Sequence, residues 1–333
     1  MPAKAEGRRI PGSSHNLLSR FAEHAFWLGR YVERAENLAR LLAVTESFAA
    51  GDDDEAAWAS LLHTFVDAEA FAATGKRRTG LNVARWYLID RTNPGSAVSA
   101  LGAARENARA LRHLIPVEIW KQINMLYGEM AGIRSRQVSL PKLNGICERI
   151  RLGCQTHQGI VDGAWYRDEA WLFHRIGCEL ERADQTTRLV DVKYYQLHGD
   201  AEIADDEDAP RPDIVWWNSL LRSASGYHAF RRRYPLTAGP ADAAGFLLFD
   251  SDFPRSVRLS ALSAFDRLRE LEEDYGAPPG EALAAARAQL LDRFADRPKR
   301  LIGRPLHTYL DRLQQDLIDV AAALRARYFD PGG

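Results

Sequence analysis

The chain has 333 residues, enough for one large domain or two of ordinary size, and 46% of them are hydrophobic. A hydrophobic fraction this high can build a real core, which excludes global disorder. The net charge of −1 gives no bulk electrostatic attraction to nucleic acid or to a membrane surface, so neither is expected as a partner.

Amphipathic helices are predicted along the whole chain. Apolar residues recur every three or four positions from Ser14 to Ala50, which predicts one helix of about ten turns. No segment alternates with the two-residue period of a strand, so the predicted fold class is all-α, a helical bundle. Further helix starts are expected at the stretches "GDDDE" (Gly51 to Glu55) and "NPGS" (Asn93 to Ser96), at Pro116, at Pro141, near Arg167 for a second long helix, and at Pro305.

The sequence repeats itself at long range. "GRYVERAENLARLL" (29–42) aligns with "GCELERADQTTRLV" (177–190), at an offset of 148 residues. Two further pairs follow in the same order, which makes coincidence a poor explanation. They are "WASLL" (58–62) with "WNSLL" (217–221), and "LIDRTNPGS" (88–96) with "LFDSDFPRS" (248–256).

These matches predict an internal duplication. The two helical repeats would cover residues 14–160 and 165–330, packed about a pseudo-twofold axis as one compact unit. The offset grows by 11 residues between the first and the second pair of matches. An acidic, proline-flanked segment at 199–212 accounts for the difference and is expected to be an exposed loop insertion in the second repeat.

A charged face runs along each of the two long helices. Gly, Glu, Asn or Gln, and Arg fall at positions i, i+4, i+8 and i+11, beside the apolar stripe. These residues are Gly29, Glu33, Asn37 and Arg40 in the first copy and Gly177, Glu181, Gln185 and Arg188 in the second. Arg34 and Arg182 lie about 100° round the helix and can reach a different neighbour.

Buried charge is costly unless it is paired. The favoured interpretation of this face is therefore a Glu–Arg network that fixes the register of the two helices. A ligand or partner site at the pseudo-axis and a solvated face are the alternatives. A glycine inside a helix costs of order 1 kcal/mol, so Gly29 and Gly177 are easiest to explain where another backbone or a ligand approaches.

A second repeated element has the pattern Asp-x3-Pro-x-Ser. Its favoured interpretation is helix capping, because Asp and Ser side chains can satisfy the first backbone amides of a helix. The alternative is an anion site at the helix N-terminus, assisted by nearby arginines. The residues concerned are Asp90, Ser96, Arg105 and Arg109 in the first copy and Asp250, Arg255 and Ser256 in the second.

The motifs of common cofactor sites are missing from the sequence. Glu33/Glu36 and Glu181/Asp184 have the spacing of bundle metal sites, but no Glu-x-x-His accompanies them, so no metal is expected. No phosphate-binding loop, dinucleotide fingerprint or serine elbow occurs, so no cofactor is expected. The basic run "YHAFRRRYP" (227–235) is interpreted as a solvated or ion-paired turn rather than as a nucleic-acid contact.

The cellular context expected from the sequence is the cytoplasm. The three cysteines, Cys147, Cys154 and Cys178, form no CxxC pair, which indicates a reducing compartment and no structural zinc. The N-terminal stretch has no apolar core of a secretory signal, and no apolar run is long enough for a bilayer.

The quoted motifs resemble those of a bacterial family. "FWLGRYVERAENLARLL", "NPGSAVSALGAARENARALR" and "DFPRSVR" are similar to the alpha-E domain, an all-helical domain of unknown function named for its ER motif, over about residues 14 to 328. Small departures are Gly95, where a small polar residue is expected, and Cys178 and Glu179, where the first copy has Arg30 and Tyr31.

The resemblance implies a context. Alpha-E proteins resemble a component of small operons. The neighbours in these operons include a circularly permuted ATP-grasp protein of the amide-ligase type and a transglutaminase-like peptidase. Some members of the family are fused to the ATP-grasp domain. The implied function is a helical accessory subunit that docks the ligase and holds an anionic substrate or peptide end. An enzyme acting on amide bonds with Glu33 or Glu181 as base, and a purely structural interaction protein, are the alternatives. A homodimer is also compatible.

Overall fold

The computed structural model describes residues 19–49, 54–198, 214–298 and 303–330, together with residues 17, 51 and 301. Over these residues the secondary structure is helical and contains no strand, so the predicted all-α class is confirmed. The predicted insertion at 199–212 lies outside the described residues. None of the described helices combines the length and the apolar character that crossing a bilayer requires.

The helices fall into two consecutive series. The first series is α1 (Ser19–Phe48), α2 (Glu55–Thr64), α3 (Ala68–Ala72), α4 (Gly80–Leu88), α5 (Ala97–Ala110), α6 (Val117–Ala131) and α7 (Leu140–Ala164), with a 3-10 turn at Ser135–Gln137. The second series is α8 (Glu169–His198), α9 (Ile214–Ser223), α10 (Tyr227–Arg233), α11 (Pro240–Phe249), α12 (Val257–Tyr275), α13 (Gly280–Ala295) and α14 (Gly303–Tyr328).

The starts of several helices follow from local capping. Asp54 accepts a hydrogen bond from the Ala57 amide at the start of α2, as expected from "GDDDE".

One interpretation of the sequence was wrong. The basic run 227–235 is expected to be a solvated or ion-paired turn, but residues 227–233 of it form the short helix α10. The ion pairing is present, since Arg233 pairs with Asp250 at 3.0 Å and with Asp252 at 3.1 Å.

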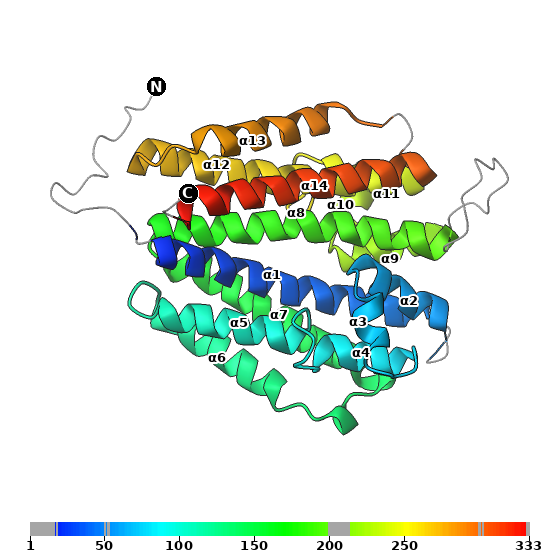
Figure 1. Cartoon of the computed structure of the whole chain (residues 1–333). Helices are drawn as coiled ribbons and strands as arrows, with labels where there is room; N and C mark the ends of the chain where they lie inside the picture. Colours follow the sequence, from blue (N-terminus) through cyan, green and yellow to red (C-terminus); the bar gives the residue numbers. More distant parts are fainter. Residues whose placement is uncertain are drawn as a thin grey trace.

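Helices α1 and α8 lie side by side in the middle of the molecule (Figure 1). Helices α5, α6 and α7 lie on one side of this pair, and α12, α13 and α14 lie on the other. Helix α5 packs on α1, and α12 packs on α8. Because the central pair is covered on both sides, its apolar residues are buried, including Leu28 and Val32 of α1 and Ile176 and Leu180 of α8.

The two central helices run parallel and come very close. Contacts advance in the same direction along both, from the bond between the Leu17 amide and Glu169 to the pair of Arg34 with Glu181. A Cβ on Gly29 would lie well within 3.0 Å of the His174 carbonyl oxygen, and one on Gly177 equally close to the carbonyl oxygen of Phe26. The expectation that a neighbouring backbone explains both glycines is therefore met.

We predict that Gly29→Ala or Gly177→Ala destabilises the protein. The added methyl meets a backbone oxygen that cannot turn away, so the helices must separate, at a cost of about 1–3 kcal/mol. The matched control is Gly159→Ala in α7, where a Cβ meets nothing within 4 Å and helix propensity improves by up to about 1 kcal/mol. Urea denaturation measures the free energy of unfolding of the three variants and of the wild type. Equal stability of the three variants would contradict the close approach.

Candidate functional site

Two carboxylates are buried where α1 meets α8. Glu33 of α1 and Glu181 of α8 are both 0% exposed. Each extends from a helix whose neighbouring residues form the apolar core, so no water solvates the charge. The arginines around them therefore decide whether the site is stable.

The two ER motifs bind each other crosswise. Arg182 of α8 donates to Glu33 from Nε at 3.1 Å and from Nη2 at 2.9 Å. Arg34 of α1 donates to Glu181 from Nε at 2.7 Å and from Nη2 at 3.1 Å. Both contacts are bidentate, which is the strongest arrangement of a guanidinium on a carboxylate. The carboxylate of each helix is thus bound by the ER arginine of the other.

Each carboxylate has a second arginine, and its origin differs between the two. Arg255, in the loop before α12, donates from Nη1 to Glu33 at 2.9 Å. Arg30 of α1 donates from Nε to Glu181 at 2.6 Å. In the aligned sequences the counterpart of Arg255 is Gly95, and the counterpart of Arg30 is Cys178. The second arginine of Glu33 therefore comes from the loop before α12 and that of Glu181 from α1, so each carboxylate receives two arginines.

The amides expected on this face also join the network. Asn37 donates to Glu33 at 3.2 Å, and Gln185 donates to Glu181 at 3.2 Å, each from one turn further along the same helix. Asn37 also accepts a hydrogen bond from Arg255 at 3.2 Å. Each carboxylate therefore accepts hydrogen bonds from its own helix and from the facing central helix.

Arg40 and Arg188 extend the network to the ends of other helices. Arg40 pairs with Glu36 and donates to the carbonyl oxygen of Ser223, the last residue of α9, at 2.9 Å. Arg188 pairs with Asp184 and donates to the carbonyl oxygen of Thr64, the last residue of α2, at 3.3 Å. Carbonyls at helix C-termini have no partner within their own helix, so each arginine satisfies an otherwise orphaned group.

The arginines outweigh the effect of burial on the acids. Burial alone would raise the pKa of Glu33, but Arg182 and Arg255 lower it to about 2. Burial likewise opposes ionisation of Glu181, and Arg30 and Arg34 lower its pKa to about 2. Both groups are firmly ionised at neutral pH. A general base needs a pKa near the working pH, so this environment is unsuited to one.

The space beside the network is small. A cavity of about 10 Å³ is lined by residues that include Asn37, Arg40, Gln185 and Arg255. That volume is about what one water molecule requires. The space beside these four residues therefore has no room for a peptide end or a metabolite.

The Asp-x3-Pro-x-Ser elements act as local caps. The Ser96 hydroxyl accepts from the Ser99 amide at 3.2 Å, and the Ser256 hydroxyl accepts from the Leu259 amide at 3.1 Å. Asp250 accepts from the amides of its own loop, and Asp90 does the same and also pairs with Lys76. The first amides of α5 and α12 are thus capped by the chain's own side chains.

The arginines proposed to assist an anion site at the start of α5 (Arg105 and Arg109) and of α12 (Arg255) are bound to other groups. Arg105 donates to Asn124 of α6 at 2.7 Å, and Arg109 pairs with Glu106 at 2.6 Å. Both interactions lie on the partly exposed outer side of α5. Arg255 instead reaches Glu33 and Glu36 of α1. These contacts are those of ion pairing and helix packing.

Sequence comparison overlooked two members of the network. Arg30 was not proposed because its counterpart in the second copy is Cys178, so the repeat signal did not mark it. Glu36 was noted only for its spacing from Glu33, but it binds both Arg40 and Arg255. A search for arginines one turn before each ER motif would have found Arg30.

Two histidines form a separate buried pair. The Nε2 atoms of His157 in α7 and His174 in α8 lie 3.2 Å apart, so one imidazole donates to the other. Both residues are 0% exposed. Burial lowers the pKa of His157 to about 3 and also lowers that of His174, which keeps both rings neutral. The three cysteines are buried as well.

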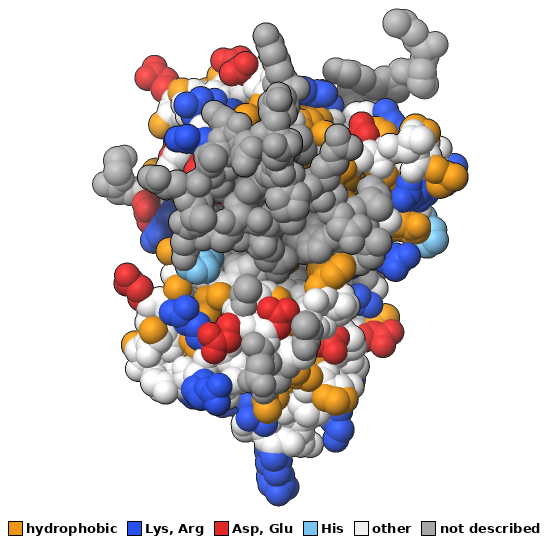
Figure 2. All heavy atoms as spheres, turned by 90° about the vertical axis from the view of Figure 1, so that its right-hand side faces the viewer, with side chains coloured by type: hydrophobic (Ala, Val, Ile, Leu, Met, Phe, Trp, Pro, Cys, Tyr) orange, Lys and Arg blue, Asp and Glu red, His pale blue; other side chains and the backbone are white. Residues whose placement is uncertain are grey.

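Charges of both signs are mixed on the surface. Figure 2 shows the face at the right-hand end of Figure 1. Around the residues drawn in grey, Lys and Arg side chains are interspersed with Asp and Glu rather than gathered together. This part of the surface has no single-sign patch of the kind that binds a polyanion.

We predict that Glu33→Gln destabilises the protein by about 3–5 kcal/mol, because it removes the buried charge that Arg182 and Arg255 share and leaves each of them with one acidic partner, Glu179 and Glu36 respectively. Glu181→Gln should have a similar effect through Arg30 and Arg34. Chemical denaturation measures the loss. The control is Glu106→Gln, a half-exposed pair that should change stability by less than about 0.5 kcal/mol. A Glu33 variant as stable as this control would refute the role of the network.

We predict that His157 makes stability fall in mild acid. Its pKa is about 6.5 in the unfolded chain and about 3 in the folded one. Between these values only the unfolded chain takes up the proton, so His157 should lower stability by about 1.4 kcal/mol per pH unit as the pH falls. Chemical denaturation of His157→Gln across this pH range should show a free energy of unfolding that depends less steeply on pH than that of the wild type. The control is His228→Gln at an exposed position, which should keep the wild-type dependence of stability on pH. If the His157 variant keeps that dependence as well, His157 is not its origin.

The comparisons with known proteins agree with the motifs. Residues 17–329 match the alpha-E family, described as a predicted alpha-helical domain with a conserved ER motif. Uncharacterized proteins of Mycobacterium bovis and Mycobacterium tuberculosis are 25% identical over 351 residues, which cover 99% of this chain and 37% of theirs. No solved structure matches the chain. Since the family model spans nearly the whole sequence, the chain belongs to the alpha-E family.

Proposed function

We propose that the chain is a helical accessory subunit of an ATP-grasp amide-ligase system, which docks the ligase and leaves the chemistry to it. The observation that carries this proposal is the closed seam between α1 and α8. Glu33 and Glu181, the candidate bases, are fully buried and each is bound by two arginines. A group in that state stabilises a scaffold and cannot readily reach a substrate.

The length of the relatives supports a role beside another protein. The chain spans 37% of the mycobacterial relatives, so in them the matching region is part of a much longer polypeptide. A region that is joined to further sequence in these relatives suits a domain that works in contact with another. The choice of an ATP-grasp ligase as partner comes from the resemblance to the alpha-E family and is the part that the experiment below tests.

We also infer that the scaffold arose by duplication, with α1–α7 and α8–α14 related by a pseudo-twofold axis. Crosswise contacts support this symmetry. Arg40 binds the C-terminus of α9 and Arg188 that of α2, each reaching into the other repeat. Val66 and Ser225, which follow those two helices, share the left-handed φ of 58°. Parallel α1 and α8 fit an axis that runs along the bundle.

The test is to combine the purified chain with an ATP-grasp protein of the amide-ligase type from the same organism. We expect the two to co-elute in size-exclusion chromatography and to appear as one complex in native mass spectrometry. We also expect ATP turnover of the ligase with candidate amino acids to change at least severalfold when the chain is added. Two proteins that neither co-elute nor alter ATP turnover would refute the proposal.

Two further results separate the alternatives. If Glu33→Gln remains folded and still binds the ligase while product formation is lost, the carboxylate takes part in catalysis and the enzyme alternative gains. If the complex forms but ATP turnover does not change and no small molecule raises the melting temperature, a purely structural interaction protein is the better description. The half-exposed Glu106→Gln serves as the control for both.

A further inference from the structure

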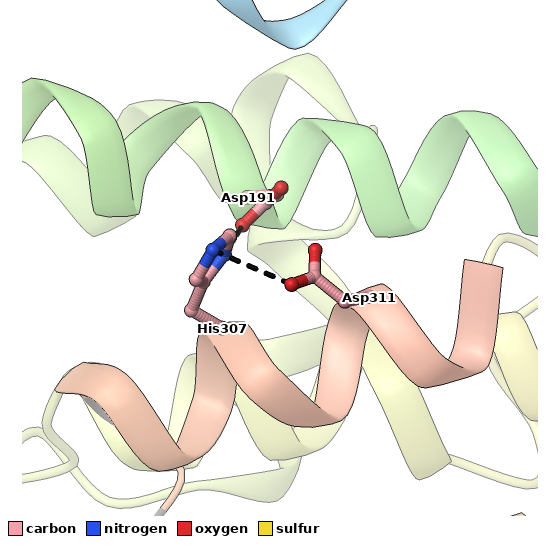
Figure 3. A group of neighbouring side chains, drawn as sticks. All are labelled: Asp191, His307 and Asp311. Atoms are coloured by element: carbon pink, nitrogen blue, oxygen red, sulfur yellow. Dashed lines mark hydrogen bonds and ion pairs between the residues drawn. The ribbon is translucent and has the colours of Figure 1, made fainter. Parts of the chain in front are cut away.

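A second cluster of ionisable groups lies between α8 and α14, away from the seam. Asp191 of α8 faces His307 and Asp311 of α14 across the contact between the two helices (Figure 3). His307 and Asp311 are four residues apart, so they share one face of α14. One potential ligand atom from each of the three side chains lies within 4.8 Å of the other two.

One of the two distances within this cluster is a hydrogen bond, and the other is compatible with a shared ion. Nδ1 of His307 lies 2.8 Å from Oδ1 of Asp191, which is a normal hydrogen bond. Nε2 lies 3.5 Å from Oδ2 of Asp311, which is too long for a good one. Two ligands on one tetrahedral zinc ion, each about 2.1 Å from the metal, stand about 3.4 Å apart. The second distance is therefore close to that of two ligands on a single ion.

The charges also leave room for a cation. Among the described residues, the ion pairs of Asp191 and Asp311 go only to His307. With a neutral imidazole the cluster carries two negative charges, which one divalent ion balances. Glu33 and Glu181 differ, because each of them is already bound by two arginines.

We propose that His307 Nε2 and the Asp311 carboxylate bind a divalent transition-metal ion, with zinc as the best fit. An imidazole and a carboxylate are ligands that zinc accepts. Asp191 accepts the Nδ1–H bond and holds the ring so that Nε2 faces the ion, as carboxylates do behind metal-bound histidines. The Asp311 side chain is 58% exposed, so the ion can enter from solvent and water fills its remaining positions. This site is independent of the proposed role with a ligase.

The experiment is a titration of the metal-free chain with zinc chloride by isothermal calorimetry. We expect one saturable site, and a rise in melting temperature, because the ion binds the folded state only. His307→Gln and Asp311→Asn should each abolish the site. Asp191→Asn should weaken it about 10- to 100-fold, as expected for a residue that orients a ligand. Asp319→Asn removes another carboxylate of α14, one that bonds Gln315, and should leave binding unchanged.

Cobalt gives a readout that does not depend on the variants. A Co²⁺-loaded wild-type chain should show weak visible absorption without a thiolate charge-transfer band, because the ligands are nitrogen and oxygen, and added zinc should remove it. A thiolate band would place the ion on a cysteine and overturn the proposal. No saturable zinc binding, or undiminished binding by a folded His307→Gln protein, would overturn it as well.

Discussion

The crossed Glu–Arg pairs between α1 and α8 are the interaction on which the rest of the structure depends. Gly29 and Gly177 allow the two backbones to approach so closely that the carboxylates one turn later lose all contact with water. A buried carboxylate without a partner would destabilise the fold by several kcal/mol. The bidentate contacts of Arg34 and Arg182 offset that cost only in one register of the helices, so they fix how the two halves meet.

The network also connects elements well beyond the seam. Arg255 joins the start of α12 to α1, while Arg40 and Arg188 join α1 to α9 and α8 to α2. Each of these contacts reaches from one half of the chain into the other. Because every charge serves two elements at once, the loss of one arginine would loosen several helix contacts together. This arrangement explains why a charged pattern occurs inside helices that otherwise form the core.

The molecule contains two kinds of electrostatic environment. At the seam, each acid has two guanidiniums, its pKa is low and the adjacent space is about 10 Å³. Between α8 and α14, two acids share one histidine and one of them is open to solvent. The first environment is suited to holding a scaffold together. The second has a solvent-accessible carboxylate beside an imidazole, which is why the proposed function and the proposed metal site rest on different residues.

The sequence by itself predicted the two long helices and the serine caps, because each depends on residues close together in the chain, and it revealed the similarity between the two ER motifs. The 3.6-residue periodicity predicted α1 and α8, Ser96 and Ser256 marked helix starts, and the offset of 148 residues matched the two ER motifs. Only the tertiary structure decided which charge binds which. Arg30 replaces an arginine that Gly95 cannot supply, and Asp191 meets His307 from 116 residues away. Such partners are set by how helices pack, and periodicity along a single helix carries no information about the side chains of its neighbour.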